Sequence, residues 1–429
     1  MYKITEVKIS GFWGSYTAQL KFGNDVNIVI GKNGTGKTTF MNILSAILTV
    51  DSVGLDENDF TEVVIKLKDR SKIKTIKVTK TLNGPFTVVH YAISRVTHSF
   101  PLLLGDEARF NSLARRRAIE AVSEVKASMG EFVSIASLSV YRFRAGAEQE
   151  IRERSRRLLG PVDLHLDRLL QGLTSYQLEL SQAARNISLE LQRDVLTSLL
   201  YRAGDTNKAG YALDFDEERE RKDLVSVYKN LGIFDQEVNK RIQDHLAAVK
   251  GSVTAIKKTR TEKLPDWQDI DFEPLEAAQR AHSIFKMSLK AEEKTKKIFS
   301  HADSFLELLG KFVDGKRFKF DNVGRFVVEK IGLSKSTIVE SIPVEKLSSG
   351  EKQLIILFVE ALLQRQQPYV FLADEPEISL HIAWQRNIIP AIRLLNPNAQ
   401  IIVATHSPEV AGKFRSNTID MEDMLHVDA

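Results

Sequence analysis

A chain of 429 residues is long enough for about two or three domains, and a composition with 43% hydrophobic and 27% charged residues is ordinary for a globular protein, which excludes general disorder. The lack of cysteine excludes disulfides and thiolate metal sites, and a reducing, cytoplasmic setting is expected. The net charge of +4 neither demands nor excludes nucleic acid, and no stretch reaches the ~18 apolar residues of a membrane span, so no membrane partner is expected.

The N-terminal part is predicted to form strands around one helix. Alternation of apolar and polar residues over Lys3–Ser10 and Thr17–Phe22 predicts two exposed strands, and the apolar run Val26–Ile30 predicts a buried one. A helix is expected over Lys37–Leu48. Three further β-rich runs predict an antiparallel meander: Glu62–Leu67, Lys72–Lys80 and Phe86–Ile93.

The middle of the chain changes in character. After a predicted helix at Arg109–Met129 and a predicted strand at Phe132–Val140, the segment Glu148–Val313 has helical patterning and mixed charge. Apolar residues recur there at steps of three and four: Leu166, Leu170, Leu173, Leu180, Ala184, Ile187 and Leu191. This stripe predicts a helix that packs on a partner helix, either inside the monomer or in an intermolecular coiled coil.

Strand character returns toward the C-terminus. Short strands are predicted at Arg317–Phe320, Arg325–Lys330 and Thr337–Glu340. A helix at Glu351–Gln364 follows, and then two apolar runs with the composition of buried parallel strands, Tyr369–Ala373 and Gln400–Ala404.

A glycine-rich loop directly follows the apolar run that ends at Ile30. Gly31–Thr38 matches the phosphate-loop pattern and lies between a predicted strand and a predicted helix. The glycines let backbone N–H groups face phosphate oxygens at a helix N-terminus, while Lys37 reaches the β- and γ-phosphates of ATP and Thr38 offers a hydroxyl to Mg²⁺. The residues expected to bind nucleotide are Asn33, Gly34, Gly36, Lys37, Thr38 and Thr39.

A second chemical motif is the apolar strand that ends in two acids, Asp374 and Glu375. Adjacent carboxylates at the end of a buried strand are costly unless positive charge meets them. Asp374 is therefore a candidate Mg²⁺ ligand, and Glu375 is a candidate for polarising the attacking water. A strand that simply ends at a solvated turn is the alternative.

The segment Leu347–Gln353 resembles the signature motif of the ABC ATPase superfamily, in an S-S-G-E form. Ser348 and the N–H groups around Gly350 form a second anion cradle at a helix N-terminus. In that superfamily the cradle binds the γ-phosphate held by the other subunit, which implies that Ser348, Ser349 and Gly350 contact nucleotide. The alternative is a helix cap with no ligand.

His406, which follows the second apolar strand, resembles the switch histidine of the same superfamily. This resemblance implies that His406 touches the γ-phosphate and is catalytic together with Glu375. The superfamily's glutamine loop has no clear counterpart here: Gln149 is a candidate by position, and Arg142 or Arg144 is an alternative phosphate sensor.

Three segments resemble SMC, RecF and OLD-type ATPases rather than transporter subunits: Lys8–Phe12, Asn27–Gly34 and Glu375–His381. The chain looks like the stand-alone ATPases of anti-phage defence operons, such as the ATPase subunit of PARIS-type systems. OLD-type proteins carry a nuclease domain after the ATPase, whereas few residues follow His406 here. The resemblance therefore implies a separate effector partner, a nuclease.

The implied fold is α/β: an ABC ATPase head with a P-loop core and an antiparallel β subdomain, interrupted by an inserted, mainly helical arm or lid. Residues 1–147 and 314–429 are expected to form the two halves of the head, and residues 148–313 the insertion. The resemblance implies a homodimer or higher homo-oligomer whose composite sites each hold ATP and Mg²⁺ between one phosphate loop and the opposing signature.

Two functions from different classes remain open at this point. The first is a sensor and scaffold ATPase that controls a separate effector, and the second is a RecF- or SMC-like ATPase that clamps DNA. Three basic clusters are candidate DNA contacts or solvated helix faces: Arg115–Arg117, Arg152–Arg157 and Lys257–Arg260.

Overall fold

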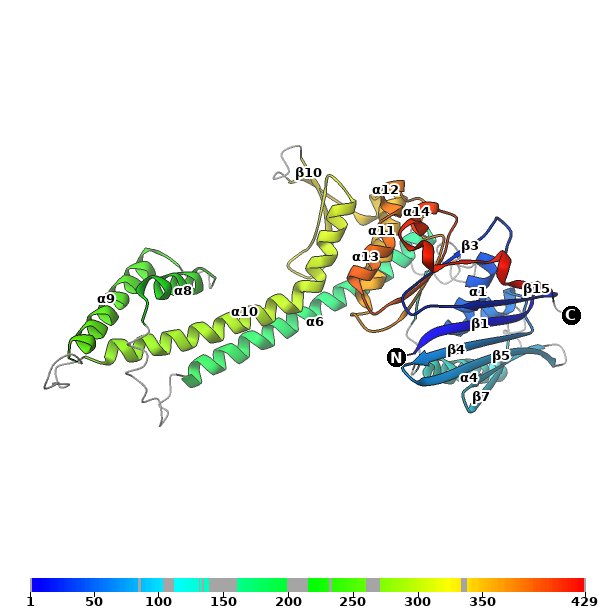
Figure 1. Cartoon of the computed structure of the whole chain (residues 1–429), viewed down its shortest axis with the longest axis horizontal. Helices are drawn as coiled ribbons and strands as arrows, with labels where there is room; N and C mark the ends of the chain where they lie inside the picture. Colours follow the sequence, from blue (N-terminus) through cyan, green and yellow to red (C-terminus); the bar gives the residue numbers. More distant parts are fainter. Residues whose placement is uncertain are drawn as a thin grey trace. The chain divides into compact units, whose positions relative to one another are not determined.

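The computed structural model describes residues 2–83, 86–102, 112–130, 132, 135–138, 160–198, 215–230, 234–259, 271–332 and 338–427. The chain divides into two compact units, the first made of Met1–Tyr176 and Ala302–Ala429 and the second of Gln177–His301. Two long helices, α6 (Pro161–Ser198) and α10 (Glu273–Phe312), each belong to both units (Figure 1).

An antiparallel sheet of seven strands, in the order β15-β2-β1-β4-β5-β6-β7, forms one layer of the first unit (Figure 1, blue except for the C-terminal β15). Its strands are β1 (Lys3–Phe12), β2 (Tyr16–Lys21), β4 (Glu62–Asp69), β5 (Lys72–Asn83), β6 (Phe86–Ile93), β7 (Val96–Pro101) and β15 (Leu425–Val427). The prediction that the first two strands are exposed is wrong. Strand β1 is an inner strand, paired with β2 and β4, and it buries Ile4, Val7 and Ile9 on one face.

A second sheet has five parallel strands in the order β14-β3-β13-β12-β8. Its strands are β3 (Val26–Ile30), β8 (Ile135–Leu138), β12 (Val370–Asp374), β13 (Gln400–Ala404) and β14 (Thr418–Asp420). The two apolar runs predicted as buried parallel strands, at 369–373 and 400–404, pair with each other as β12 and β13. Because β3, β13 and β12 are neighbours with the same direction, the loops after them meet at one edge of the sheet.

Helix α1 (Lys37–Thr49) lies between the two sheets. It buries Phe40, Ile43 and Leu44 in a core cluster that also contains Val7 of the antiparallel sheet and Leu372 of the parallel sheet. Helix α2 (Ser52–Glu57) packs on α1, and α4 (Ser112–Gly130) packs on β7 and β6 of the antiparallel sheet. The first turn of α1 is thereby fixed at the edge where the loops converge.

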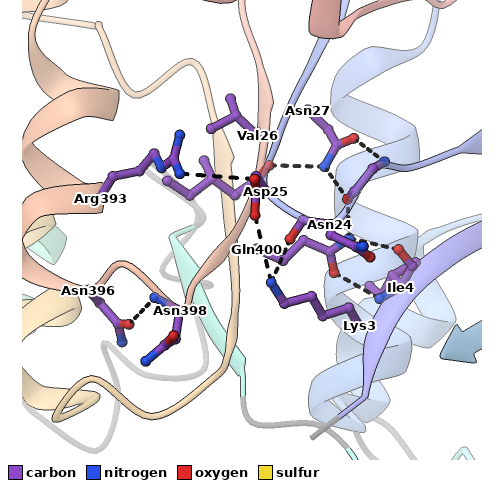
Figure 2. Close-up of polar contacts among 12 residues, drawn as sticks. Lys3, Ile4, Asn24, Asp25, Val26, Asn27, Arg393, Asn396, Asn398 and Gln400 are labelled. Atoms are coloured by element: carbon purple, nitrogen blue, oxygen red, sulfur yellow. Dashed lines mark hydrogen bonds and ion pairs between the residues drawn. The ribbon is translucent and has the colours of Figure 1, made fainter. Parts of the chain in front are cut away.

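The side chain of Gln400 joins the two sheets at the opposite edge (Figure 2). It is fully buried, and its amide nitrogen donates to the carbonyl oxygens of Ile4 and Gly23, both at 2.7 Å, while its amide oxygen accepts from the N–H of Ile4 at 2.8 Å. Asp25 lies beside it, 3.9 Å from the ammonium of Lys3 and 4.0 Å from the guanidinium of Arg393. A buried amide with three partners fixes the start of β13 against β1.

The remaining part of the first unit surrounds the signature segment. A three-stranded antiparallel sheet precedes it, made of β9 (Lys316–Phe320), β10 (Phe326–Ile331) and β11 (Ile338–Ile342). The helices that follow are α11 (Ser349–Leu363), α12 (Ile382–Gln385), α13 (Ile388–Leu395) and α14 (Pro408–Ala411), with 3₁₀ turns η1 (Val344–Lys346), η2 (Gly412–Asn417) and η3 (Glu422–Met424). Helix α11 is buried on nearly every side, and α6 is tied to it because Asp163 accepts from Lys352 at 2.7 Å.

The second unit is helical in its described part. It contains α8 (Glu217–Asn230), α9 (Gln236–Thr259), the part of α6 from Gln177 onward and the part of α10 up to His301. Lys294 of α10 donates to Glu190 of α6 at 3.1 Å, so these two helices are partners within one chain. Along the apolar stripe of α6, Leu166 and Leu173 are buried and the other members are partly buried, while Leu178, Leu189 and Leu196 of the same helix are exposed. Within the described residues, no helix combines the length and apolarity needed to cross a membrane.

Candidate nucleotide-binding site

The phosphate loop curls because three of its residues occupy left-handed backbone conformations. Gly31, Gly34 and Gly36 have φ angles of 148°, 83° and 90°. Only glycine takes these angles without strain. At Gly36 a Cβ atom would also come within 2.8 Å of the Phe12 ring. The loop therefore wraps the N-terminus of α1, where unpaired N–H groups and the helix dipole attract anions.

Lys37, the first residue of α1, is buried with 4% of its surface exposed. Its ammonium donates to the carbonyl oxygens of Gly31 and Lys32, both at 2.9 Å. Burial lowers the pKa of Lys37, and the charges of nearby carboxylates, chiefly Glu375 and Asp374, oppose that shift. The structure therefore brings the loop lysine and the two acids of β12 into one electrostatic environment.

Glu375 follows β12 in a strained conformation, with a φ of 48°. Its N–H donates to the carbonyl of Ala404 at 2.8 Å, which extends the pairing of β12 with β13 by one residue. Its carboxylate lies 3.8 Å from Nε2 of His406. Both side chains are about one-third exposed, at 33% and 37%, so a solvent molecule can approach them. The candidate water-polarising acid and the candidate switch histidine are thus neighbours.

Glu377, two residues further on, is buried with 8% of its surface exposed. One carboxylate oxygen, Oε1, accepts from the hydroxyl of Thr405 and from the N–H groups of His406 and Ser407, the last two at 3.3 and 3.2 Å. Burial raises the pKa of Glu377, against the opposing effect of these hydrogen bonds. No role was predicted for this acid, although it belongs to the segment Glu375–His381, which reads E-P-E-x-x-L-H and is called the E-P-E segment below.

The signature segment is organised by its own neighbours. Ser348 caps α11: its hydroxyl accepts from the N–H of Glu351 at 3.3 Å, and the Glu351 carboxylate accepts from the N–H of Ser348 at 3.0 Å. Lys316 pairs with the same carboxylate, and although burial opposes it, the pKa of Glu351 is lowered by these partners. The capping alternative is therefore real, and it leaves Ser349 exposed at the surface.

Gly350 lies directly against the turn after β12. A Cβ atom at this position would overlap the carbonyl oxygen of Ser379, which itself has a φ of 67°, and would lie 3.7 Å from the ring of Trp384. No hydrogen bond or ion pair between described residues joins Ser348–Gly350 to Gly31–Thr39. Within one chain the two anion cradles are separate.

The donor set suits ATP with Mg²⁺. Thr38 and Asp374 offer oxygen ligands, which Mg²⁺ prefers, and Mg²⁺ is usually held by one or two protein groups together with phosphates and water. The curled N–H groups and the buried ammonium of Lys37 suit phosphate oxygens. Across the described residues, there is no group of three or more histidine or acidic side chains that could hold a metal by itself.

Two further residues, Trp13 and Glu422, border the site although they were not predicted from the sequence. The Trp13 ring is 44% exposed and would lie 3.0 Å from a Cβ at Gly36. Glu422 accepts from the N–H of Lys32 at 3.2 Å and from its ammonium at 3.1 Å. The turn that carries Trp13 is glycine-rich in sequence, whereas Glu422 had no local signal because strand β14 alone brings it to the loop.

Gln149, Arg142 and Arg144 lie outside the described residues, as does the cluster at 152–157. In the first basic cluster, Arg116 pairs with Glu120 at 3.0 Å along the same helix.

A P-loop beside a two-acid strand and a histidine, on adjacent parallel strands with an antiparallel sheet over α1, defines an ABC-type ATPase of the SMC/RecF-like kind. A family model described as "AAA ATPase domain" matches residues 2–411, so the chain belongs to that family.

One known protein is similar to part of this sequence, and solved structures align with the chain. The Retron Ec83 probable ATPase of Escherichia coli is 35% identical over 95 residues, a match that spans 20% of this chain and 17% of that protein. The Smc head domain with an extended coiled coil bound to the C-terminal domain of ScpA, from Pyrococcus furiosus, aligns at 15% identity over 100% of this chain and 96% of that chain with a TM-score of 0.42. The Smc head domain with a coiled coil and joint from Pyrococcus yayanosii aligns at 16% identity over 100% and 97%, with a TM-score of 0.41.

Proposed function

We propose that this protein hydrolyses ATP in composite sites that two copies form together, and that the closed assembly controls a separate effector in anti-phage defence. Lys37 binds the phosphates, Thr38 and Asp374 hold Mg²⁺, and Glu375 orients the attacking water with His406 beside the γ-phosphate. When bound, Mg²⁺ neutralises charge that develops on the phosphates. Ser348, Ser349 and Gly350 serve the nucleotide of the partner copy.

One observation supports this proposal most strongly. The charges of Glu375 and Asp374 act on Lys37, and Glu375 lies beside His406, whereas no described polar contact joins the signature cradle to the phosphate loop of its own chain. A cradle of exposed Ser348 and Ser349 at a helix N-terminus has the chemistry to bind phosphate. A second copy of the chain is the simplest source of that phosphate.

Mixing two inactive variants tests the composite site. Lys37→Ala removes the phosphate-binding ammonium, and Ser349→Arg obstructs the signature while leaving the Ser348 cap in place. Each variant alone should lack ATPase activity, because both sites of its dimer are damaged. A mixed dimer contains one site with an intact phosphate loop from one copy and an intact signature from the other, so mixing should restore activity.

The control is nucleotide affinity. The Ser349→Arg protein should bind a fluorescent ATP analogue as the wild type does, since Ser349 does not contact its own phosphate loop. If the mixture stays inactive while both variants remain folded and Ser349→Arg still binds nucleotide, sites shared between copies are ruled out.

The defence role has a different kind of support. The E-P-E-x-x-L-H segment resembles defence ATPases, and the partial match is to a protein named as a retron ATPase. We propose a sensor and scaffold whose effector, a nuclease, is encoded nearby. The Glu375→Gln variant, which should bind ATP without hydrolysing it, would be purified with the products of adjacent genes and measured by mass photometry with ATP or ADP.

ATP-stabilised assembly with a neighbouring protein, indifferent to added DNA, is the expected result. A lone dimer that closes on duplex DNA, with affinity that falls steeply with salt, would instead establish the RecF- or SMC-like alternative. Arg116 and Arg117 of α4 and Lys257 of α9 are exposed and belong to the described part of the basic clusters that such DNA would meet.

A further inference from the structure

The segment that carries His406 is held by an acid from the neighbouring strand. Oε1 of Glu377 collects a hydroxyl and two backbone N–H groups from three consecutive residues, Thr405, His406 and Ser407. Thr405 is itself buried, and its hydroxyl oxygen accepts a second bond from the N–H of Ser407 at 2.9 Å. One carboxylate oxygen therefore sets the backbone path directly after β13.

The imidazole of His406 has far less support of its own. It is 37% exposed, and its described polar contact is the 3.8 Å approach to Glu375. A side chain in that position takes its direction from the backbone that bears it. The backbone at 405–407 is fixed by Glu377, so the distance between His406 and Glu375 depends on an acid that touches neither side chain.

The burial of Glu377 indicates that this contact is specific. Its second oxygen, Oε2, is buried and has no hydrogen-bond partner among the described residues. A buried carboxylate with one unpaired oxygen destabilises the fold. A residue present only for stability would be an apolar side chain, or an acid with both oxygens hydrogen-bonded. What the acid contributes is one oxygen, Oε1, that accepts hydrogen bonds from three donors at residues 405–407.

We propose that Glu377 is a positioning residue for ATP hydrolysis, which places His406 against Glu375 by holding the 405–407 backbone. The proposal rests on the proposed ATPase function. It assigns to the second acid of the E-P-E segment a task distinct from that of the first, since Glu375 acts on water and Glu377 acts through His406.

Two substitutions of similar size separate hydrogen bonding from packing. Glu377→Gln keeps a carbonyl oxygen for the three donors and puts its amide nitrogen where Oε2 has no partner, so kcat should stay near wild type. Glu377→Met fills the same space without an acceptor. Its kcat should fall about 10- to 100-fold, as expected for misplacement of a catalytic group by about 1 Å, with KM and ATP affinity unchanged. Glu409→Gln is the matched control. Glu409 lies three residues after His406 and pairs with Arg386, so this variant should leave kcat unchanged.

A double-mutant cycle tests whether Glu377 acts through His406. His406→Ala should lower kcat, and adding Glu377→Met should lower it no further, because the histidine to be positioned is already absent. Multiplying penalties, or equal losses of kcat in Glu377→Gln and Glu377→Met, would overturn the proposal.

Hydrogen exchange provides a readout that does not need ATP hydrolysis. In nucleotide-free protein, the amide of His406 should exchange faster in Glu377→Met than in wild type or Glu377→Gln, because Oε1 of Glu377 is its acceptor, whereas the amide of Ser407 keeps the Thr405 hydroxyl as a second acceptor and should change less. Unchanged exchange in Glu377→Met would refute the positioning role even if kcat fell. If the wild type does not hydrolyse ATP at all, the proposed function fails, and the exchange measurement alone decides whether Glu377 holds this segment.

Discussion

Gly350→Ala adds one methyl group at the point where the signature helix meets the turn after β12. That Cβ would overlap the Ser379 carbonyl, and reaching an ordinary contact of 3.4 Å requires a backbone movement of about 1 Å. Trp384, 3.7 Å from the same Cβ, limits escape on another side. Overpacking of this kind costs about 1–3 kcal/mol of unfolding free energy. Gly310→Ala is the matched control, because that glycine lies in α10 with nothing within 4 Å of a Cβ.

Urea unfolding of the full chain would compare the two variants. Gly310→Ala should be more stable than wild type by about 0.5–1 kcal/mol, since alanine is the better helix residue, whereas Gly350→Ala should be less stable. Fluorescent ATP should bind Gly350→Ala normally, because the phosphate loop is not displaced, and ATP-dependent dimers should be lost in mass photometry. Wild-type stability together with wild-type assembly in Gly350→Ala would refute the inferred crowding at Ser379.

Three further outcomes are expected. Gln400→Leu removes the side-chain partner of the buried N–H and carbonyl groups of Ile4 and one of the two donors to the Gly23 carbonyl, the other being the Asn27 amide, and should lower the free energy of unfolding by about 3 kcal/mol in chemical denaturation; a wild-type midpoint would contradict this. Trp13, next to the phosphate loop, should change its fluorescence when Mg·ATP binds, and the change should vanish in a Trp13→Phe protein. Burial lowers the pKa of His245 below its ordinary 6.5. The stability that the neutral imidazole contributes is therefore fully present above pH 6.5 and is lost as the pH falls through the lowered pKa. His245→Gln should make thermal unfolding, followed by circular dichroism, less sensitive to acid, and equal sensitivity in both proteins would disprove this.

The parallel sheet was largely predictable from sequence. The runs at 26–30 and 400–404 are short, apolar and bounded by turn residues, which is the pattern of strands buried on both faces, and both strands have those bounds in the structure. The order of motifs along the chain also indicated the class of ATPase. By contrast, β7 (Val96–Pro101) escaped prediction because an edge strand with few apolar residues lacks a clear alternation.

Interactions between distant segments could not be predicted in the same way. Glu377 meets Thr405 only because β12 and β13 lie side by side, and Glu422 meets Lys32 only because the last strand of the parallel sheet pairs with β3. The approach of Trp13 to Gly36 depends likewise on packing of the antiparallel sheet over α1. Local sequence patterns carry no information on such pairings, so the roles assigned to the site residues beyond their motifs depend on the fold.

The contact between Gln400 and Ile4 joins positions separated by 396 residues. Contacts this distant in sequence are slow to form, since the intervening chain must first be brought together. During synthesis at about 5–20 residues per second, the N-terminal sheet would wait about 20–80 s for its buried amide to emerge, while the helices of the second unit, whose contacts are closer in sequence, can already fold. The N-terminal sheet therefore has to persist without the buried amide that joins it to the parallel sheet until residue 400 has been made.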